Sequence, residues 1–243
     1  MDERWIVLNT GQRSAEENMK IDAELLDRAH TLEKPILHLY EWEGDSATFG
    51  YFAHPEKLLN LEQVNKKGLN LARRPTGGGM IFHLWDMAFS IIVPAHSLHF
   101  SLNTLDNYAY VNRIVLQVIE EFSVHFPPLT LIEEDGPALD PSCHHFCMAK
   151  PTKYDVLWDG KKIAGAAQRK TKAGFLHQGS ISLVLPEKDY LQEILAPGTS
   201  VQQAMQIHTY PLLGSSASES EIRLAKEKLA ALLATQLNKS SLE

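Results

Sequence analysis

The chain has 243 residues, of which 44% are hydrophobic and 22% charged, which excludes a wholly disordered protein. Acidic residues outnumber basic ones, 30 to 23, and the net charge of −7 argues against sequence-independent nucleic-acid binding, which needs clustered Lys and Arg. With two cysteines, no secretory leader and no long apolar run, we expect one cytoplasmic domain spanning 1–243, without disulfides, nucleic-acid partners or membrane contact.

The first half of the chain is expected to alternate short strands with two helices. A helix is predicted at 18–29 from its apolar spacing, and another at 59–67 ends at Gly68, a residue type common just after helices. Branched and aromatic residues predict five strands, at 4–8, 36–42, 47–52, 69–74 and 80–94.

The second half begins with a predicted helix at 104–122, whose apolar residues recur at spacings of three and four. Residues 125–152 carry five prolines and are expected to form a long irregular connection. The dipeptide Asp159-Gly160 predicts the turn of a hairpin, and another strand is expected at 174–186.

A terminal helix is expected from Ser218 to about residue 237, because Glu221 lies three residues after this serine, as in a capping box. Strands and helices follow one another without a regular strand–helix–strand repeat, which favours an α+β fold. We expect a core at about 5–185 and a helical extension at about 186–243.

A glycine-rich segment follows the expected strand at 69–74. Three consecutive glycines remove every Cβ from a tight loop, so that its N–H groups can approach an anion, and two arginines add donors suited to carboxylate or phosphate. The alternative is an ordinary hairpin with solvated arginines. The candidate substrate-binding residues are Arg73, Arg74, Thr76, Gly77, Gly78 and Gly79.

A second candidate segment lies just after the expected hairpin turn. A lysine there is followed by small residues, which would aim one ammonium group into a crowded pocket and leave room for a ligand beside the backbone. The alternative is a surface hairpin with solvated lysines, as is usual for this residue type. The candidate residues are Lys162, Gly165, Ala166 and Ala167.

The segment Ser142-Cys143-His144-His145-Phe146-Cys147 allows three interpretations. A structural zinc site would need a second ligand pair at suitable spacing, which the sequence lacks, so we expect no tightly bound metal. A nucleophilic thiol would need a nearby cation to lower its pKa, and Lys162 is a candidate for this. The third interpretation is an inert, partly buried thiol.

These segments together are similar to the motifs of one family. The letters RRPTGGGMIFH resemble its arginine–glycine loop, DVLWDGKKIAGAAQ and HQGSISL resemble its Gly-Lys-Lys hairpin and the strand that follows, and NMKIDAELL resembles its first helix. The family is the biotin/lipoate protein ligase catalytic-domain superfamily, and within it the lipoate–protein ligase A and octanoyltransferase group. The resemblance covers roughly residues 5–185.

The resemblance implies a class II synthetase-like and biotin ligase-like α+β fold, with a central mixed sheet flanked by helices. It also implies transfer of a lipoyl or octanoyl group to a lysine of a carrier, such as the lipoyl domains of 2-oxo acid dehydrogenases or the glycine-cleavage H protein. On this basis Cys147 and Lys162 are the expected catalytic residues, and His83 and His177 join the substrate-binding set.

Two chemistries compete within this group. One branch of octanoyltransferases takes the acyl group from acyl carrier protein as a cysteine thioester, and its Cys-x-x-x-Pro-x-x-Tyr pattern is matched by Cys147, Pro151 and Tyr154. Lipoate ligases instead use ATP and Mg²⁺ to form an acyl-adenylate, and three glycines in the loop are more typical of them. The thioester route is the first hypothesis and the ligase the second.

Two positions depart from the patterns of both branches. Leu84 follows His83 where an aspartate is usual, and His38 occupies the place of a strand arginine. These departures support a third hypothesis, a non-catalytic protein that binds an acyl group or a carrier. A biotin–protein ligase is a weaker alternative, because the characteristic loop of that family is absent.

Basic residues gather at the end of the expected hairpin. Because lipoyl and acyl carriers are generally acidic and the chain itself is acidic, productive docking would require a local basic face. We therefore predict carrier docking at Arg169, Lys170 and Lys172, the alternative being an ordinary solvated surface.

Overall fold

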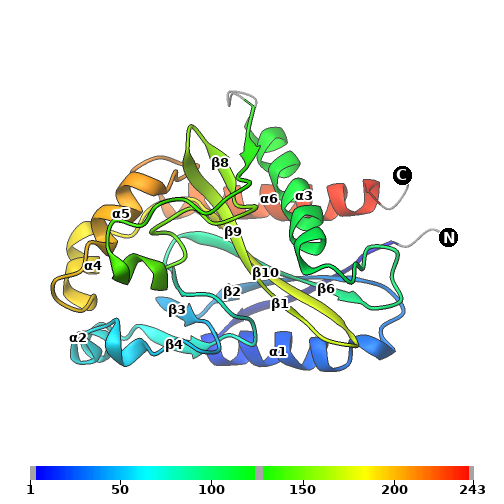
Figure 1. Ribbon diagram of the computed structural model, residues 1–243, viewed down its shortest axis with the longest axis horizontal. Coiled ribbons are helices and arrows are strands. Elements are labelled where there is room, and N and C mark those ends of the chain that lie inside the picture. The colour runs from blue at the N-terminus through cyan, green and yellow to red at the C-terminus, as the bar shows by residue number, and fades with distance from the viewer. Residues whose placement is uncertain (1–3, 124–127, 241–243) are drawn as a thin grey trace.

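A seven-stranded mixed sheet forms the centre of the computed structural model, which describes residues 4–123 and 128–240 (Figure 1). Its strands are β1 (Ile6–Arg13), β2 (Ile36–Trp42), β6 (Asp86–Pro94), β7 (Thr130–Leu131), β8 (Val156–Trp158), β9 (Lys161–Lys170) and β10 (Gly174–Ser182). They lie in the order β1-β2-β6-β10-β9-β8-β7, with β1 and β2 parallel and the other neighbours antiparallel. This mixed sheet with helices packed on it confirms the expected α+β class.

A second, three-stranded sheet lies beside the first and consists of β3 (Ser46–Phe49), β4 (Asn70–Arg73) and β5 (Met80–His83). The prediction of one strand at 80–94 is wrong, because the chain changes sheets at Leu84 and Trp85. Before this point β5 pairs with β3, and after it β6 pairs with β2 and β10. A continuous apolar run cannot show such a change, since both strands are buried.

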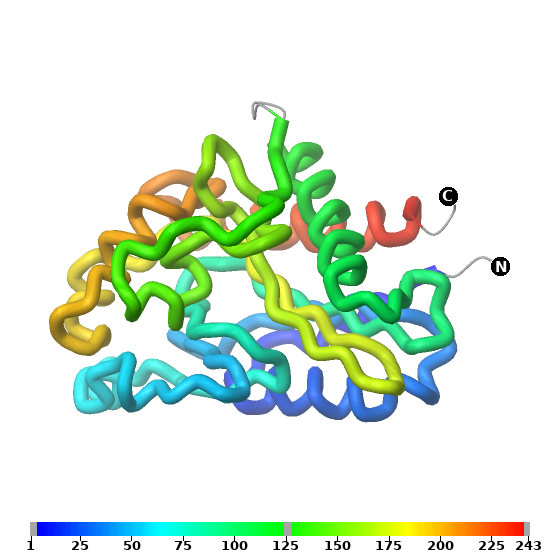
Figure 2. The backbone as a smooth tube through the Cα atoms, in the orientation of Figure 1, coloured from blue at the N-terminus to red at the C-terminus, as the bar shows by residue number. Residues whose placement is uncertain are grey.

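Helices α3 (Thr104–Phe122) and α6 (Glu219–Lys239) cover one face of the large sheet, and α1 (Ala15–Asp27) covers the other (Figure 2). The alternation of β6 sorts its side chains between these faces. Phe89, Ile91 and Val93 join the core under α3 and α6, whereas Ala88 and Ile92 pack on the side of α1.

Capping residues determine where two of these helices begin. The predicted capping box of Ser218 and Glu221 is confirmed at the start of α6. The same motif, Ser14 with Glu17, begins α1 three residues earlier than expected. Each box satisfies backbone N–H groups that the first turn leaves unpaired.

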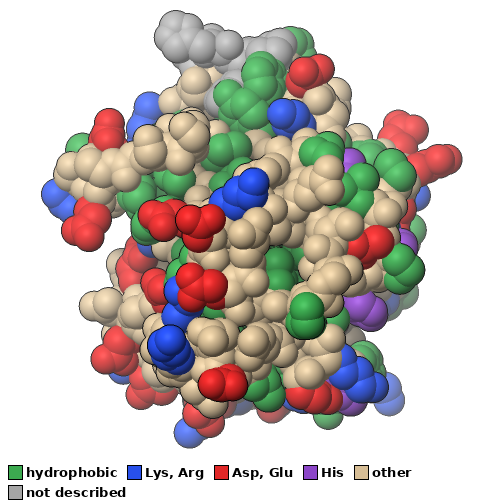
Figure 3. Space-filling model, turned by 90° about the vertical axis from the view of Figure 1, so that its left-hand side faces the viewer, with side chains coloured by type: hydrophobic (Ala, Val, Ile, Leu, Met, Phe, Trp, Pro, Cys, Tyr) green, Lys and Arg blue, Asp and Glu red, His purple; other side chains and the backbone are tan. Residues whose placement is uncertain are grey.

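One 3₁₀ segment, Ala29–Thr31, follows α1 and packs against the large sheet. The remaining helices lie around the small sheet: α2 (Leu61–Lys67), α4 (Lys188–Ile194) and α5 (Val201–His208), with 3₁₀ segments at Pro55–Lys57 and Pro141–His145. They form a second core with β3 and β5. Acidic and basic side chains are interspersed on this side of the molecule (Figure 3). Among the described residues, no helix is both long and apolar enough to cross a bilayer.

The β8–β9 hairpin turns at Asp159 and Gly160, as predicted, and both residues have positive φ, 48° and 72°. The expected irregular stretch at 125–152 contains β7 and the 3₁₀ segment Pro141–His145, although residues 124–127 lie outside the described part. This stretch returns the chain from α3 to the small sheet, where Phe146 bridges Met80.

Candidate active site

The glycine loop joins β4 to β5 and is folded around the buried side chain of Arg74. One guanidinium nitrogen, Nη1, donates to the Thr48 carbonyl at 3.1 Å and to Thr48 Oγ1 at 2.9 Å. The other, Nη2, donates to the carbonyls of Gly77 at 3.0 Å and Gly79 at 2.8 Å. Arg74 therefore holds the loop in shape, a role that the sequence pattern alone did not separate from ligand binding.

Close packing explains the last glycine of the loop. A Cβ on Gly79 would lie 2.4 Å from the carbonyl oxygen of His145, in the segment that leads to Cys147. In the described part of the chain, the amide N–H groups of Gly77, Gly78 and Gly79 donate no hydrogen bond. None of the three glycines lines the pocket that contains Cys147, but a Cβ on Gly78 would lie 4.0 Å from Cys147 Sγ, so the loop runs beside the thiol.

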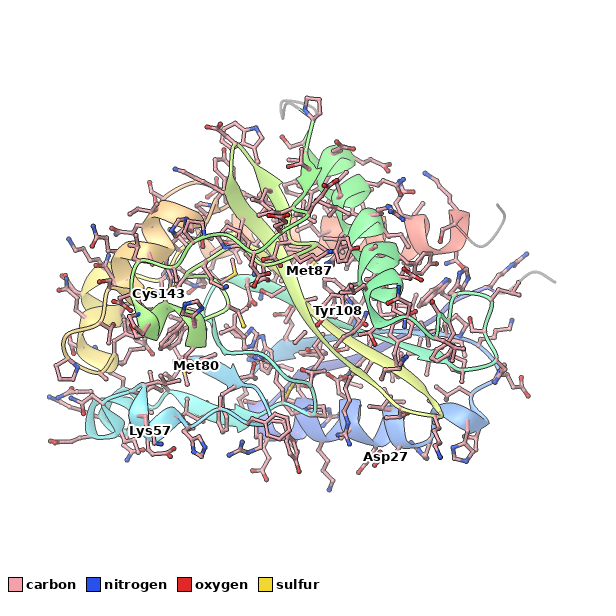
Figure 4. All side chains as sticks on the ribbon, in the orientation of Figure 1. Asp27, Lys57, Met80, Met87, Tyr108 and Cys143 are labelled. Carbon is pink, nitrogen blue, oxygen red and sulfur yellow. The ribbon has the colours of Figure 1, made fainter. Side chains whose placement is uncertain are left out.

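Cys147 follows the 3₁₀ segment and has both of its backbone groups held. Its N–H donates to the Met80 carbonyl at 2.8 Å, and its carbonyl accepts from Lys162 Nζ at 2.8 Å. The half-buried thiol lies 3.9 Å from Arg74 Nη2. Cys143 is fully buried in the second core together with Met80 (Figure 4), and burial raises the pKa of its thiol.

Lys162 projects from β9 and is buried together with Asp155. Their side chains, each 3% exposed, form an ion pair with Nζ and Oδ2 2.7 Å apart. Burial raises the pKa of Asp155 against the opposing effects of Lys162 and of Thr152, which donates to the carboxylate from N at 2.6 Å and from Oγ1 at 2.8 Å. The ammonium is thus directed at Asp155 and at the backbone of Cys147.

Gly165 makes room for this lysine. A Cβ at Gly165 would lie 2.3 Å from Lys162 Cε and 2.5 Å from Asp155 Oδ1. The absence of a side chain at Gly165 therefore leaves space for the Lys162 side chain. The neighbouring Ala166 and Ala167 line a pocket together with Lys162. The sequence predicted a crowded pocket around one ammonium group, and the structure shows this crowding.

One pocket brings together the glycine-loop arginine, the thiol and the lysine. Its apolar wall consists of Met19, Tyr40, Trp42, Ile81 and Met148. Its polar side consists of Thr48, Arg74, His83, Cys147, Lys162, Gln178 and Ser180. An apolar wall with a few polar groups at one side is typical of a small-molecule site.

His83 lines this pocket, but both of its ring nitrogens are engaged. Nδ1 lies 2.8 Å from Asp86 Oδ2 and Nε2 lies 2.9 Å from Thr48 Oγ1, while the ring stacks on Trp42 at 4.1 Å. Burial raises the pKa of Asp86, but His83 and Ser180 outweigh this and the pKa is lowered. His83 is therefore held in the pocket wall by Asp86, Thr48 and Trp42.

His177 does not lie in the pocket. It is fully buried, its Nδ1 lies 3.0 Å from Gln168 Nε2, and its ring packs near Phe89 and Tyr108. Burial lowers the pKa of His177 to about 3, so the ring stays neutral. Alternation along β10 directs the next residue, Gln178, to the pocket instead.

Gln178 belongs to a buried network that the sequence analysis did not find. Thr76 Oγ1 donates to Gln178 Oε1 at 2.6 Å, and Gln178 Nε2 donates to Asp22 Oδ2 at 2.6 Å. Asp22 Oδ1 pairs with His38 Nδ1 at 2.7 Å, and His38 Nε2 contacts Thr10 Oγ1 at 2.9 Å. His38, which departs from the family pattern, is thus accommodated by a hydrogen bond to Asp22, which is linked through Gln178 to Thr76 of the glycine loop.

The other unusual residue, Leu84, packs against the second core rather than against the pocket. It follows β5 directly, and the pocket-lining His83 before it keeps both of its hydrogen bonds. The departure at Leu84 therefore leaves the described pocket intact. Among the described residues, no cluster of three or more His, Cys, Asp or Glu side chains could hold a metal ion.

The predicted docking residues are exposed and lie around the outer end of the β9–β10 hairpin. Arg169 Nη1 donates to the Pro75 carbonyl at 3.4 Å, which links the hairpin to the glycine loop. Lys170 donates to the carbonyl of Leu102, and Lys172 is exposed in the turn. Arg73 is also exposed and donates to the carbonyls of Tyr51 and Ala53.

Comparison with known proteins agrees with this arrangement. Residues 14–211 match the family model described as the lipoyl protein ligase A/B catalytic domain. The chain belongs to this family. The octanoyltransferase LipM of Lysinibacillus sphaericus is 32% identical over 189 residues, which cover 77% of this chain and 68% of the relative. The expected superfamily and enzyme class, an acyltransferase or ligase of protein lipoylation, are confirmed.

Solved structures support the fold. A lipoate–protein ligase A bound with ATP has a TM-score of 0.65 at 23% identity, covering 98% of this chain and 95% of that chain. A bipartite lipoate protein ligase from Thermoplasma acidophilum, studied with its E2 lipoyl domain, has a TM-score of 0.63 at 21% identity, covering 98% and 92%. At these identities the likeness concerns the fold alone.

Proposed function

We propose that this chain, as one catalytic domain spanning 1–243, transfers an octanoyl or lipoyl group to a carrier lysine through a thioester on Cys147. The observation that carries the proposal is the position of the Cys147 thiol. It lies 3.9 Å from the Arg74 guanidinium, in a pocket that is also lined by Lys162 and by an apolar wall. The thiolate is the nucleophilic form of cysteine. The name of the relative at 32% identity, an octanoyltransferase, supports the same chemistry.

In the first half-reaction, the Cys147 sulfur attacks the carbonyl carbon of a thioester donor. A new carbon–sulfur bond forms, the donor carbon–sulfur bond breaks, and the donor thiol leaves with the proton that the cysteine gave up. The amide N–H groups of Gly77, Gly78 and Gly79 stabilise the transient oxyanion. Acyl carrier protein is the proposed donor.

In the second half-reaction, a neutral carrier lysine attacks the Cys147 thioester. The amine loses one proton to solvent, an amide bond forms, and the carbon–sulfur bond breaks to regenerate the thiolate. Lys162 acts by holding the carbonyl of Cys147 and thereby the direction of its side chain. Arg169, Lys170 and Lys172 contribute to docking of the acidic carrier.

The substrate-binding roles follow from the same geometry. Gly165, Ala166 and Ala167 line the pocket beside the reacting carbonyl, Thr76 positions the pocket residue Gln178, and Arg74 keeps the glycine loop in place. His83 acts as a wall residue. The predicted substrate-binding role of His177 and the cytoplasmic location stay predictions. The proposed acceptors are lipoyl domains of 2-oxo acid dehydrogenases or the glycine-cleavage H protein.

An ATP-dependent lipoate ligase is the second candidate. The solved ligase with bound ATP favours it at the level of the fold. In that route Lys162 would bind the acyl carboxylate and the α-phosphate. Here its ammonium already lies 2.7 Å from Asp155 and 2.8 Å from the Cys147 carbonyl, which is the specific reason for placing the thioester route first.

The test is mass spectrometry of an apo lipoyl domain incubated with the protein. One reaction contains octanoyl-loaded acyl carrier protein without ATP, and the other contains lipoate, ATP and Mg²⁺. We expect ATP-independent modification that Cys147→Ala abolishes. Cys143→Ala, a buried cysteine outside the pocket, is the matched control and should retain modification. Modification that needs ATP and survives Cys147→Ala would establish the ligase instead.

A further inference from the structure

A second hollow lies outside the glycine loop, between α1 and β4. It is lined on the α1 side by Glu16, Met19 and Lys20 and on the other side by Arg73, Pro75 and Arg169. Met19 and Arg74 line both this hollow and the catalytic pocket. The two cavities are therefore neighbours that share the buried side chains of Met19 and Arg74 as a common wall.

The charge of this hollow is opposite to that of the whole chain. Lys20, Arg73 and Arg169 are exposed there, and Glu16 is the one acidic residue among the described residues that line it. None of the ion pairs in the described ranges 4–123 and 128–240 includes any of these three cations. Three basic side chains converge on one concave site in a protein of net charge −7, which indicates an anionic ligand.

The two arginines are also oriented in part by the backbone. Arg73 Nη1 donates to the carbonyls of Tyr51 and Ala53, and Arg169 Nη1 donates to the Pro75 carbonyl. Arg73 also lies over the Phe49 ring, with 4.8 Å from the guanidinium carbon to the ring centroid. These contacts occupy one nitrogen of each guanidinium and leave donors for a ligand, since a guanidinium has five N–H groups.

We propose that this hollow, formed by Lys20, Arg73 and Arg169, binds the phosphate of the phosphopantetheine arm on which the acyl donor is carried. The inference rests on the proposed function, because it takes the acyl group to arrive as a thioester. Such an arm joins its thioester at one end to a phosphate at the other. The structure places the thiol 3.9 Å from Arg74 Nη2 in the pocket, and the basic hollow next to it shares the Arg74 side chain. A concave site with forked arginine donors is better suited to binding a phosphate group than to docking a broad protein surface.

The test measures binding to Cys147→Ala protein, which cannot form the thioester, by isothermal titration calorimetry. The probes are octanoyl-phosphopantetheine and octanoyl-pantetheine, which differ by the phosphate alone. We expect the phosphorylated probe to bind about tenfold more tightly than the unphosphorylated one. This ratio of affinities should fall about threefold in Lys20→Gln and about threefold in Arg169→Gln, each tested as a single substitution. Lys188→Gln, at an exposed lysine outside the hollow, should preserve the ratio.

Equal affinity for the two probes, or a ratio that neither substitution at the hollow lowers, would overturn the proposal. Octanoyl-coenzyme A and octanoyl-loaded acyl carrier protein as further probes separate the two sources of the arm, and a preference for the loaded protein would identify the carrier. Because binding is measured without acyl transfer, failure of the proposed function appears separately, as absence of Cys147 acylation in the wild-type protein. If the variants weaken only binding of an acidic lipoyl domain, the hollow is a protein-docking surface instead.

Discussion

Removal of the buried counter-charge of Lys162 is expected to destabilise the protein strongly. Asp155 and Lys162 are each 3% exposed and 2.7 Å apart, and Asp155 also accepts two hydrogen bonds from Thr152. Asp155→Asn leaves the ammonium buried without a counter-charge. Breaking a buried pair in this way costs about 3–5 kcal/mol, whereas the net value of the intact pair is much smaller.

Urea unfolding at pH 7 measures this effect. With a slope of about 2–3 kcal/mol per molar urea, a loss of about 3 kcal/mol lowers the midpoint by about 1–1.5 M. The matched control is Asp135→Asn, which breaks the pair with Lys150 at an aspartate that is 58% exposed. That change should cost about 0–1 kcal/mol.

A double variant tests whether the unpaired ammonium of Lys162 is the cause of the lost stability. Asp155→Asn combined with Lys162→Met removes both charges, and should recover most of the lost stability because no unpaired ammonium remains in the interior. If Asp155→Asn costs no more than the surface control, or if the double variant is less stable than the single one, the ion-pair argument is refuted.

Two further predictions concern His177 and Gly165. Burial lowers the pKa of His177 from 6.5 to about 3, so at intermediate pH the unfolded chain takes up a proton that the folded chain excludes. The contribution of neutral His177 to the free energy of unfolding is therefore full above pH 6.5 and is lost as the pH falls toward 3. Between pH 7 and pH 5 this amounts to about 2 kcal/mol, so urea unfolding of His177→Gln should show a correspondingly weaker pH dependence than wild type, and equal slopes would contradict it. Gly165→Ala places a Cβ 2.3 Å from Lys162 Cε and should lower the rate of octanoyl transfer at least about tenfold, measured by mass spectrometry at matched folded fraction. An unchanged rate would show that the transfer does not need Lys162 in this position.

Local signals in the sequence were enough for many elements of the fold. The strand at 36–42, the helix at 104–122 and the turn at Asp159 and Gly160 appear where they were expected. Alternation, helical spacing and turn chemistry act over a few residues, so a short window contains the information. The overlooked capping box of Ser14 and Glu17 was equally readable, and would have placed the start of α1 correctly.

Elements that depend on a distant partner could not be read in this way. The run at 80–94 is apolar throughout, and pairing with β3 or with β10 decides where one strand ends and the next begins. The individual helices α4 and α5 lie in the extension expected at about 186–243, where no strong periodic pattern marked them. Both pack on the second core, so tertiary burial rather than propensity stabilises them.

The sequence by itself determined which residue types we propose for the chemistry, since the motifs containing Cys147, Lys162 and the glycine loop are contiguous and could be recognised one by one. Only the tertiary structure decided what each side chain contacts. It pairs Lys162 with Asp155, directs Arg74 into the loop, and places Gln178 instead of His177 at the pocket. Burial and side-chain direction depend on which strands become neighbours, and that choice is made by the whole chain at once, beyond the reach of any short motif.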